Sequence, residues 1–140
     1  VTIGLKLAEK NNIPSIIKDF ISTHHGTGKT KFFYVSYKNE HPDEEIDENL
    51  FTYPGPNPFT REQAILMMAD TVEAASRSIN EYTEKNISDL VNKLIDCQIS
   101  EGYFHDCPIT FRDIATAKMV FIEKLKTIYH TRISYPELEP

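Results

Sequence analysis

The sequence predicts an all-α fold on three observations. Apolar residues recur at the three- and four-residue spacing of helices along most of the chain. Two segments open with the paired side chains of a capping box, Thr60 with Gln63 and Thr110 with Asp113. A single segment has a composition that also suits a strand, and no second strand candidate lies near it in the sequence. At 140 residues the chain suits one domain with one buried core, and we expect about five to six helices.

The first two predicted helices form the N-terminal segment. One runs from the first residues to about Lys10, where Asn11 and Asn12 end it. The next begins with Pro14 as its first residue, where the missing N–H is harmless, and runs to about His24. Its expected core face consists of Ile16, Ile17, Phe20 and Ile21.

The middle of the chain contains one ambiguous segment and one loop. Residues Lys29 to Asn39 are rich in aromatic side chains that also suit a strand, and we expect a helix there. The stretch from His41 to Pro58 is polar, acidic and proline-rich. Its last part, Tyr53–Pro58, has three prolines, which restrict the backbone and remove donors, so it is neither helix nor central strand. Rigid loops of this length in compact domains are often functional.

Three further helices are predicted in the second half. Their expected bounds are Thr60 to Ile79, Asn86 or Ser88 to Gly102, and Thr110 to about Thr131. The second of them carries a core stripe of Leu90, Val91, Leu94, Ile95 and Ile99. Pro136 lies in the tail that follows.

Composition limits the classes of partner. The net charge of -6 at pH 7 excludes a basic surface for long nucleic acid. An acidic protein can still bind small phosphate ligands where metal ions supply positive charge locally. No apolar run is long enough to span a bilayer, and no signal peptide precedes the first helix. The two cysteines, Cys97 and Cys107, fit neither a disulfide framework nor a zinc knuckle, which favours a reducing compartment and buried or incidental thiols.

The N-terminal residues Val1–Ala8 have an apolar helical pattern with no methionine, cap or linker before it. We therefore expect that the chain begins within a helix and is part of a longer protein.

The adjacent histidines His24 and His25, followed by Gly26, are the strongest candidates for metal ligands. Neutral imidazole is the commonest metal ligand among side chains, and a glycine behind the pair frees the backbone to aim both rings at one small volume. Histidines at a helix C-terminus also interact favourably with the helix dipole without any metal. From these residues alone both interpretations stay open.

Asp70 is the second candidate, because its helix is apolar on almost all sides and is therefore predicted to be buried. A buried carboxylate is costly unless it is paired or binds a metal. Arg77 lies two turns further along and Glu73 one turn away, so an Asp70–Arg77 or Glu73–Arg77 ion pair is the structural alternative.

Other polar motifs are weaker. Gly28-Lys29-Thr30 mimics the end of a P-loop, but Thr23 stands where that motif needs glycine, and no strand precedes it. The pair His105–Asp106 is expected to lie in a turn after Gly102, with no further ligands around it. His41 and His130 stand alone and are expected to be structural or solvent-facing.

Three stretches are distinctive when they are taken together. They are Ile21–Thr27 with Phe32–Tyr34, Tyr53–Pro56 with Ala64–Ser78, and Ile128–Pro136. They resemble membrane-associated HD-superfamily phosphohydrolases of the PgpH type. The resemblance covers nearly the whole chain, and the block from Tyr53 to Ser78 is the most specific part.

The resemblance implies a helical HD domain on the cytoplasmic face of the cell membrane, attached to seven membrane helices that lie upstream. Such a domain hydrolyses cyclic di-AMP to the linear dinucleotide at a centre of two metal ions, iron or manganese, and the family allows a homodimer. Carried over to this sequence, His24 and His25 would bind one metal and Asp70 the other, with no catalytic residue beyond the metal ligands. The substrate contacts would be Thr27, Arg77 and Tyr53. The loop Tyr53–Pro58 either borders the nucleotide pocket or is a structural crossover.

The chain departs from the family pattern at several metal ligands. The His-Asp dyad with its following Gly-Lys, the histidine before it, and a histidine expected just ahead of Val1 have no counterpart in the sequence. The resemblance therefore implies that residues 1–140 are the C-terminal portion of one HD phosphohydrolase domain, metal-poor and nearly inactive alone.

Two alternatives to cyclic di-AMP hydrolysis stay open. The same scaffold hosts other phosphohydrolases, for example enzymes that act on cyclic di-GMP, because fold does not fix function. The chain also fits a non-catalytic helical regulatory domain, and elemental analysis of the complete domain would distinguish this from an enzyme.

Overall fold

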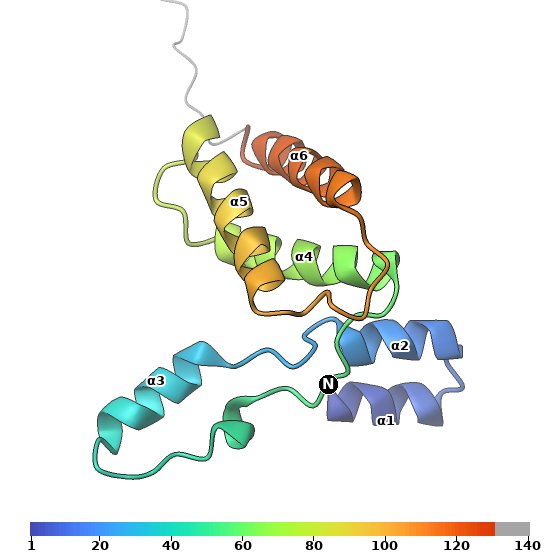
Figure 1. Cartoon of the computed structure of the whole chain (residues 1–140), viewed down its shortest axis with the longest axis vertical. Helices are drawn as coiled ribbons and strands as arrows, with labels where there is room; N and C mark the ends of the chain where they lie inside the picture. The colour runs from blue at the N-terminus through green and yellow to red at the C-terminus, as the bar shows by residue number, and fades with distance from the viewer. Residues whose placement is uncertain (131–140) are drawn as a thin grey trace, which may run out of the picture. The chain divides into compact units, whose positions relative to one another are not determined.

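The computed structural model describes residues 1–130, apart from the side chains of Lys31 and Phe32. This part of the chain forms α-helices and one short 3-10 helix (Figure 1). The elements are α1 (Thr2–Lys10), α2 (Ser15–Thr23), α3 (Lys31–Glu40), η1 (Glu48–Phe51), α4 (Arg61–Ser76), α5 (Glu84–Ser100) and α6 (Phe111–Ile128). Within residues 1–130, an isolated antiparallel β-bridge joins Lys29 and Thr52. The all-α prediction is confirmed.

The chain divides into two compact units. The first comprises Val1–Met67 with Tyr103–Pro108, and the second comprises Met68–Gly102 with Ile109–Pro140. The last part of the distinctive C-terminal stretch, residues 131–136, lies outside the described residues, as does the predicted helix end at Thr131. None of the helices in residues 1–130 is both long and apolar enough to cross a membrane.

Helices α1 and α2 form an antiparallel hairpin in the first unit (Figure 1). The connection is tight, since Asn12 has a φ of 53° and the Ile13 N–H donates to the Ala8 carbonyl at 2.9 Å. Pro14 is the N-cap of α2 and not its first helical residue, because its ψ of 145° is extended; the prediction was one residue off.

The predicted core face of α2 is wrong in two of its four residues. Ile16 is 66% exposed and Ile17 is 45% exposed, whereas Phe20 and Ile21 are half-buried. Helical spacing identifies an apolar stripe, but it does not say whether another element of the described chain covers that stripe.

Gly4 offers a simple test of the packing between α1 and α2. Its position is helical, and a Cβ there would lie 3.4 Å from Ile21 Cγ2, an ordinary contact. We expect Gly4→Ala to raise the free energy of unfolding by about 0.5–1 kcal/mol, because alanine lowers the entropy of the unfolded chain. Urea unfolding followed by circular dichroism measures this, and a loss of stability would mean that the two helices approach more closely.

Helix α3, η1 and the loop between them form one segment, which we call the α3–η1 excursion. Backbone contacts join the residues just before α3 to those at the end of η1, and these contacts close the base of the excursion. Besides the Lys29–Thr52 bridge, the Thr30 N–H donates to the Phe51 carbonyl at 2.7 Å and the Tyr53 N–H donates to Gly28 at 2.9 Å. Residues Lys31–Glu40 are helical, which confirms the prediction for the ambiguous segment.

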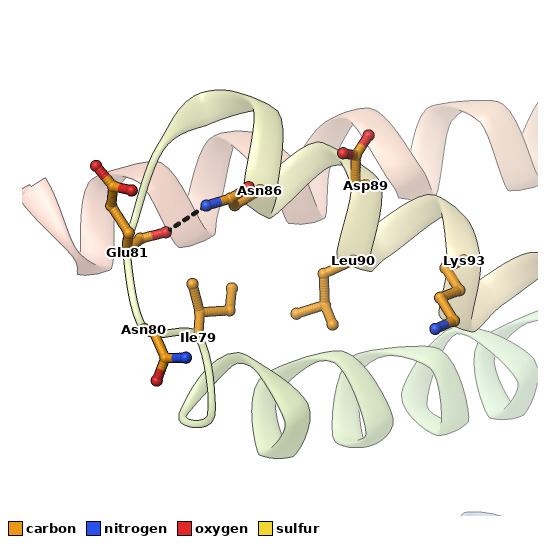
Figure 2. Close-up of a pocket in the computed structure, with 7 residues that line it drawn as sticks. All are labelled: Ile79, Asn80, Glu81, Asn86, Asp89, Leu90 and Lys93. Carbon is orange, nitrogen blue, oxygen red and sulfur yellow. Dashed lines mark hydrogen bonds between the residues drawn. The ribbon is translucent and has the colours of Figure 1, made fainter.

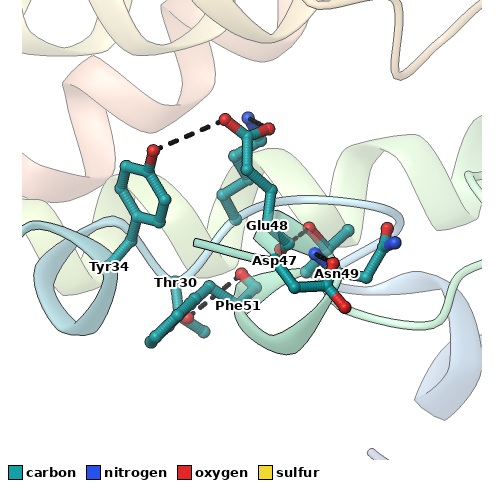
Figure 3. A network of polar contacts seen from close by, with 8 residues as sticks. Thr30, Tyr34, Asp47, Glu48, Asn49 and Phe51 are labelled. Carbon is teal, nitrogen blue, oxygen red and sulfur yellow. Dashed lines mark hydrogen bonds and ion pairs between the residues drawn. The ribbon is translucent and has the colours of Figure 1, made fainter. Parts of the chain in front are cut away.

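Glu48 is the polar centre of this excursion, as Figure 3 shows. It accepts a hydrogen bond from Lys29 Nζ at 2.7 Å, and Tyr34 Oη lies 3.5 Å from its other oxygen. The hydrogen bond from Lys29 and then its charge lower the pKa of Glu48 below the ordinary value of 4.5. Because the pKa of Glu48 is lower in the folded protein than in the unfolded chain, the Lys29–Glu48 pair contributes its full stability at pH values above the unfolded pKa. This contribution is lost as the pH falls through the folded-state pKa of Glu48.

We therefore expect the Glu48 carboxyl to titrate below pH 4.5 in the folded protein and to return toward that value in Lys29→Met. Carbon-detected NMR titration of the side chain measures both. Equal titration in the two proteins would show that Lys29 does not hold this carboxylate in solution.

The capping boxes predicted for α4 and α6 are both confirmed. Gln63 N–H donates to Thr60 Oγ1 at 3.2 Å, and the Thr60 N–H returns a bond to Gln63 Oε1 at 3.3 Å. Thr110 and Asp113 form the same reciprocal pair at 3.0 Å in both directions. The far ends of the helices were predicted less well, since α4 ends at Ser76 and not near Ile79.

Helix α5 begins at Glu84, two residues before Asn86 and four before Ser88, the two predicted starts. Thr83 is its N-cap and accepts a hydrogen bond from the Asn86 N–H, so the predicted start Asn86 lies within the first turn. The helix ends at Ser100, and Gly102 follows with a φ of 83°. Ser88 therefore lies within the helix and does not cap it.

The second unit has a well-defined apolar core. Buried members come from α4, α5 and α6: Met68, Val72, Ile87, Val91, Ile95, Ile114, Ala117 and Leu125. Val91 and Ile95 confirm the predicted stripe of α5, while Leu90, Leu94 and Ile99 are half-buried. Beyond α6, the ring of Tyr129 stacks on Tyr82 at 3.8 Å, and its hydroxyl bonds to buried Ser76 at 2.9 Å.

The second unit also contains a hollow of about 460 Å³ between the end of α4 and the first half of α5 (Figure 2). Ile79 and Leu90 supply apolar surface, and Asn86 Nδ2 donates to the Glu81 carbonyl at 2.9 Å beside them. The other lining residues are Asn80, Asp89 and Lys93. None of these residues was predicted to be functional.

Candidate metal centre

The two histidines lie at the end of α2 in the first unit. Helix α2 ends at Thr23, and His24 is its C-cap. The ring centroids of His24 and His25 are 3.9 Å apart at an interplanar angle of 38°, and both residues are half-buried. Gly26 then turns the chain with a φ of 51°, while its N–H donates to the Thr23 carbonyl at 2.9 Å. The structure thus brings the two imidazoles together, as the sequence predicts.

A backbone hydrogen bond orients the His24 ring. Nδ1 lies 2.6 Å from the carbonyl oxygen of Ile21. A carbonyl oxygen only accepts, so Nδ1 carries the proton in this bond and the neutral ring keeps a lone pair on Nε2. Metal-binding histidines use this arrangement, in which one ring nitrogen donates to the backbone and the other faces the ion. The donor chemistry at His24 therefore fits a transition metal.

Tyr53 packs against the second histidine. The Tyr53 and His25 rings are stacked, with centroids 4.4 Å apart and an interplanar angle of 25°. The tyrosine is held there by its own backbone, which donates to the Gly28 carbonyl. The loop that carries Tyr53 is thus a direct neighbour of the histidine pair.

Asn57 joins the same loop to Thr27. Its Oδ1 accepts from the Thr27 N–H at 2.9 Å and from the Thr27 hydroxyl at 3.0 Å. Thr27 Oγ1 keeps its own lone pairs as acceptors. Sequence reasoning singled out Thr27 but not Asn57, whose one signal was its place among the prolines of the loop.

The two loops are in close contact around glycines. A Cβ on Gly26 would lie 2.5 Å from Asn57 Oδ1, and a Cβ on Gly55 would lie 2.9 Å from Thr27 Cγ2. Gly55 has a φ of 72°, and the peptide bond between Gly55 and Pro56 is cis. These positions need glycine both for their backbone conformation and for the approach of the opposite loop.

The remaining predicted site residues, Asp70 and Arg77, belong to the second unit. Arg77 binds Glu73 through Nε at 3.0 Å and Nη2 at 2.7 Å, so the ion pair considered for this helix is Glu73–Arg77. The carboxylate of Glu73 raises the pKa of Arg77 above its ordinary value. The substrate contact expected of Arg77 stays a prediction.

Asp70 is half-buried on α4. The helix is not buried on all sides as was expected, because the apolar side chains of Ile65 and Leu66 are 38% and 41% exposed. In the described part of the chain, no group of three or more His, Cys, Asp or Glu side chains is arranged to hold a metal ion. The assignment of Asp70 to a second metal stays a prediction.

The other histidine and cysteine motifs have local structural environments. His41 is the C-cap of α3, where its Nδ1 lies 3.1 Å from the Tyr37 carbonyl and its ring stacks on Tyr37. Cys107 donates to the Thr60 carbonyl at 3.2 Å, and Cys97 is exposed, so neither thiol is fully buried.

Comparison with known proteins places this geometry in context. No protein-family model matches the chain. Among solved structures, the HD domain of Listeria monocytogenes phosphodiesterase PgpH in complex with cyclic-di-AMP superposes with a TM-score of 0.83 at 36% identity. The match covers 90% of this chain and 58% of that one. The chain is homologous to the PgpH HD domain.

Curated relatives agree with the structural match. The chain is 38% identical over 136 residues to the cyclic-di-AMP phosphodiesterase PgpH of Bacillus subtilis and 37% identical over 134 residues to that of Listeria monocytogenes. An uncharacterised protein of Synechocystis is 31% identical over 140 residues. The chain spans 19% and 18% of the two PgpH proteins, so it corresponds to a limited part of their length.

Proposed function

We propose that this chain forms part of a metal-dependent HD phosphodiesterase that hydrolyses cyclic di-AMP to the linear dinucleotide. The observation that carries the proposal is the match at a TM-score of 0.83 to an HD domain solved in complex with cyclic-di-AMP. The orientation of the His24 ring supports it, because Nε2 is left as a lone-pair donor suited to a metal.

Each candidate residue has a distinct role in this proposal. His24 and His25 would hold one metal ion, and Asp70 would hold the second. When bound, two divalent ions, iron or manganese, would supply positive charge that activates water and neutralises the phosphate. Tyr53 fixes the plane of the His25 ring by stacking, and Asn57 holds the Thr27 backbone beside it. The remaining ligands would come from polypeptide outside the 140 residues.

The resemblance to membrane-associated HD phosphohydrolases implies a setting for this domain. The domain would be attached to membrane helices elsewhere in the polypeptide and act at the cytoplasmic face of the membrane on a cyclic dinucleotide. A homodimer is compatible with this setting.

The test uses a completed domain, in which this chain replaces its matched part of the Listeria monocytogenes PgpH HD domain. We expect this protein to convert cyclic di-AMP with Mn²⁺ and to stop after chelation, because the negatively charged phosphodiester needs the positive charge of the ions. Chromatography of the products, with cyclic di-GMP assayed in parallel, gives the substrate class. Preference for cyclic di-GMP would overturn the choice of substrate. Turnover that survives chelation would overturn the metal mechanism, and the absence of stoichiometric metal would favour a regulatory domain.

A further inference from the structure

The side-chain amide of Asn57 offers hydrogen-bond donors beside the histidine pair. Its Oδ1 accepts from the N–H of Thr27 at 2.9 Å and from the Thr27 hydroxyl at 3.0 Å. A backbone N–H only donates, so the amide atom that faces it is the oxygen, and the other end of the amide is Nδ2. Asn57 is half-buried, and no residue of the described chain accepts a hydrogen bond from Nδ2. The amide is thus held by its oxygen and keeps two N–H donors for another partner.

The amide lies against the residue that follows His25. A Cβ on Gly26 would be 2.5 Å from Asn57 Oδ1 and 3.6 Å from Asn57 Cα. On the same loop, the ring of Tyr53 stacks on the ring of His25 with centroids 4.4 Å apart. Asn57 therefore belongs to the immediate surroundings of the candidate metal centre.

The other donors of the histidine loop are engaged within the protein. The N–H groups of Gly26 and Gly28 donate to backbone carbonyls at 2.9 and 3.0 Å, and the N–H of Thr27 donates to Asn57. The Lys29 ammonium forms an ion pair at 2.7 Å with a carboxylate of η1. The oxygens of a phosphodiester accept hydrogen bonds and do not donate, so a phosphate bound at this loop needs N–H or O–H groups that are still available. The Asn57 amide supplies two of them.

We propose that Asn57 Nδ2 donates to a phosphate oxygen of the cyclic dinucleotide. This inference rests on the proposed function, which places the phosphate of the substrate at the histidine pair. The two bonds from Thr27 fix the amide before the substrate arrives, so little side-chain freedom is lost when the phosphate binds. Asn57 is then a substrate-binding residue that orients the phosphate, in addition to holding the Thr27 backbone.

A ring nitrogen of the adenine base is the other acceptor that such a nucleotide offers to an amide. The phosphate is the better partner, because a hydrogen bond to an ionised acceptor is roughly twice as strong as one to a neutral acceptor. The place of Asn57 against Gly26, next to the imidazoles, also favours the part of the nucleotide that carries charge.

Asn57→Asp tests the proposal, because aspartate keeps an oxygen for both Thr27 bonds and removes the two N–H donors. In the completed domain defined above, we expect the KM for cyclic di-AMP to rise about 10- to 100-fold. We expect kcat to change less, and the metal content and the free energy of unfolding in urea to stay close to those of the parent. A fall in kcat or metal content at unchanged KM would assign Asn57 to the support of the histidines alone and overturn the inference.

Asn80→Asp is the matched control for the added negative charge. Asn80 is exposed in the loop between α4 and α5, and we expect its substitution to leave the KM unchanged. Both variants are also assayed at about 0.5 M salt, where repulsion between exposed charges is largely screened. A KM of Asn57→Asp that returned to the parent value at high salt would show repulsion and not a lost hydrogen bond, and would overturn the inference.

NMR of the side-chain amide gives a readout that needs no turnover. The Asn57 NH₂ signals of the isotope-labelled completed domain, loaded with diamagnetic Zn²⁺, are identified by their loss in Asn57→Asp. We expect AMP to shift these signals and adenosine to leave them in place. Equal shifts with both ligands would assign the donors to the base, and no shift with either would leave Asn57 without a nucleotide contact; each result would overturn the inference.

The two measurements separate this inference from the proposed function. If the parent domain does not hydrolyse cyclic di-AMP, the proposed function is contradicted, and the titration with AMP and adenosine still decides the role of Nδ2. If the parent is active and Asn57→Asp retains its KM, the proposed function stands and the inference is wrong.

Discussion

His24→Ala is expected to lower the rate of cyclic di-AMP hydrolysis by the completed domain at least about 100-fold, and to release one bound metal ion. The substitution removes the ring whose Nδ1 is held by the Ile21 carbonyl and whose Nε2 is presented as a ligand. Disturbing even the partners of a metal ligand changes affinity or activity by about 10–100-fold, so loss of the ligand itself should exceed that range. Initial rates and elemental analysis on the same preparation measure the two effects.

His41→Ala is the matched control. His41 also caps a helix and also places Nδ1 near a backbone carbonyl, at 3.1 Å from Tyr37. It differs in having no second histidine beside it, so we expect activity and metal content close to those of the parent protein. If both substitutions reduced activity equally, the effect would come from helix capping, and the metal assignment of His24 would be wrong.

Gly26→Ala is expected to lower the free energy of unfolding by about 2–3 kcal/mol. About 1–2 kcal/mol comes from placing a side chain at a left-handed φ of 51°. The new Cβ would also lie 2.5 Å from Asn57 Oδ1, which must then move and weaken its two bonds to Thr27, worth about 1 kcal/mol. Urea unfolding measures the change, and amide chemical shifts of Thr27 report the displaced loop.

Gly4→Ala serves as the comparison, because it adds the same methyl group at a helical position with an ordinary 3.4 Å neighbour. The two alanine substitutions should change stability in opposite directions. Stability losses of similar size would indicate a general sensitivity of the first unit and would remove the special role assigned to Gly26.

The parts of the fold that were predictable depend on residues close together in the sequence. The capping boxes at Thr60 and Thr110 follow from side chains three residues apart, and both formed as predicted. The start of α5 was missed because Thr83, Asn86 and Ser88 are all acceptable N-caps, and the choice depends on where the helix meets its core. The exposure of Ile16 could not be predicted, because periodicity does not reveal the covering element.

The candidate site likewise combines features that depend on residues close in the sequence with features that depend on distant contacts. The histidine pair is local, and the stacking of Tyr53 on His25 agrees with the predicted importance of its loop. The role of Asn57 depends on a contact that spans 30 residues, and no local pattern encodes such a pairing. The choice of Glu73 as the partner of Arg77 follows from their i,i+4 spacing, which favours that pair over one spanning two turns.

The closed base of the α3–η1 excursion has a consequence for how homologues can vary. Because Lys29 pairs with Thr52 and Thr30 bonds to Phe51, the chain leaves and rejoins the histidine region at fixed points. Lengthening a closed loop lowers the free energy of unfolding only slightly, by roughly 0.6 kcal/mol for each doubling of the loop length. Insertions and deletions near Asp43, at the far end, should therefore be tolerated without moving His24 or His25. A fluorescent peptide inserted there would mark the protein and leave the imidazole pair as it is.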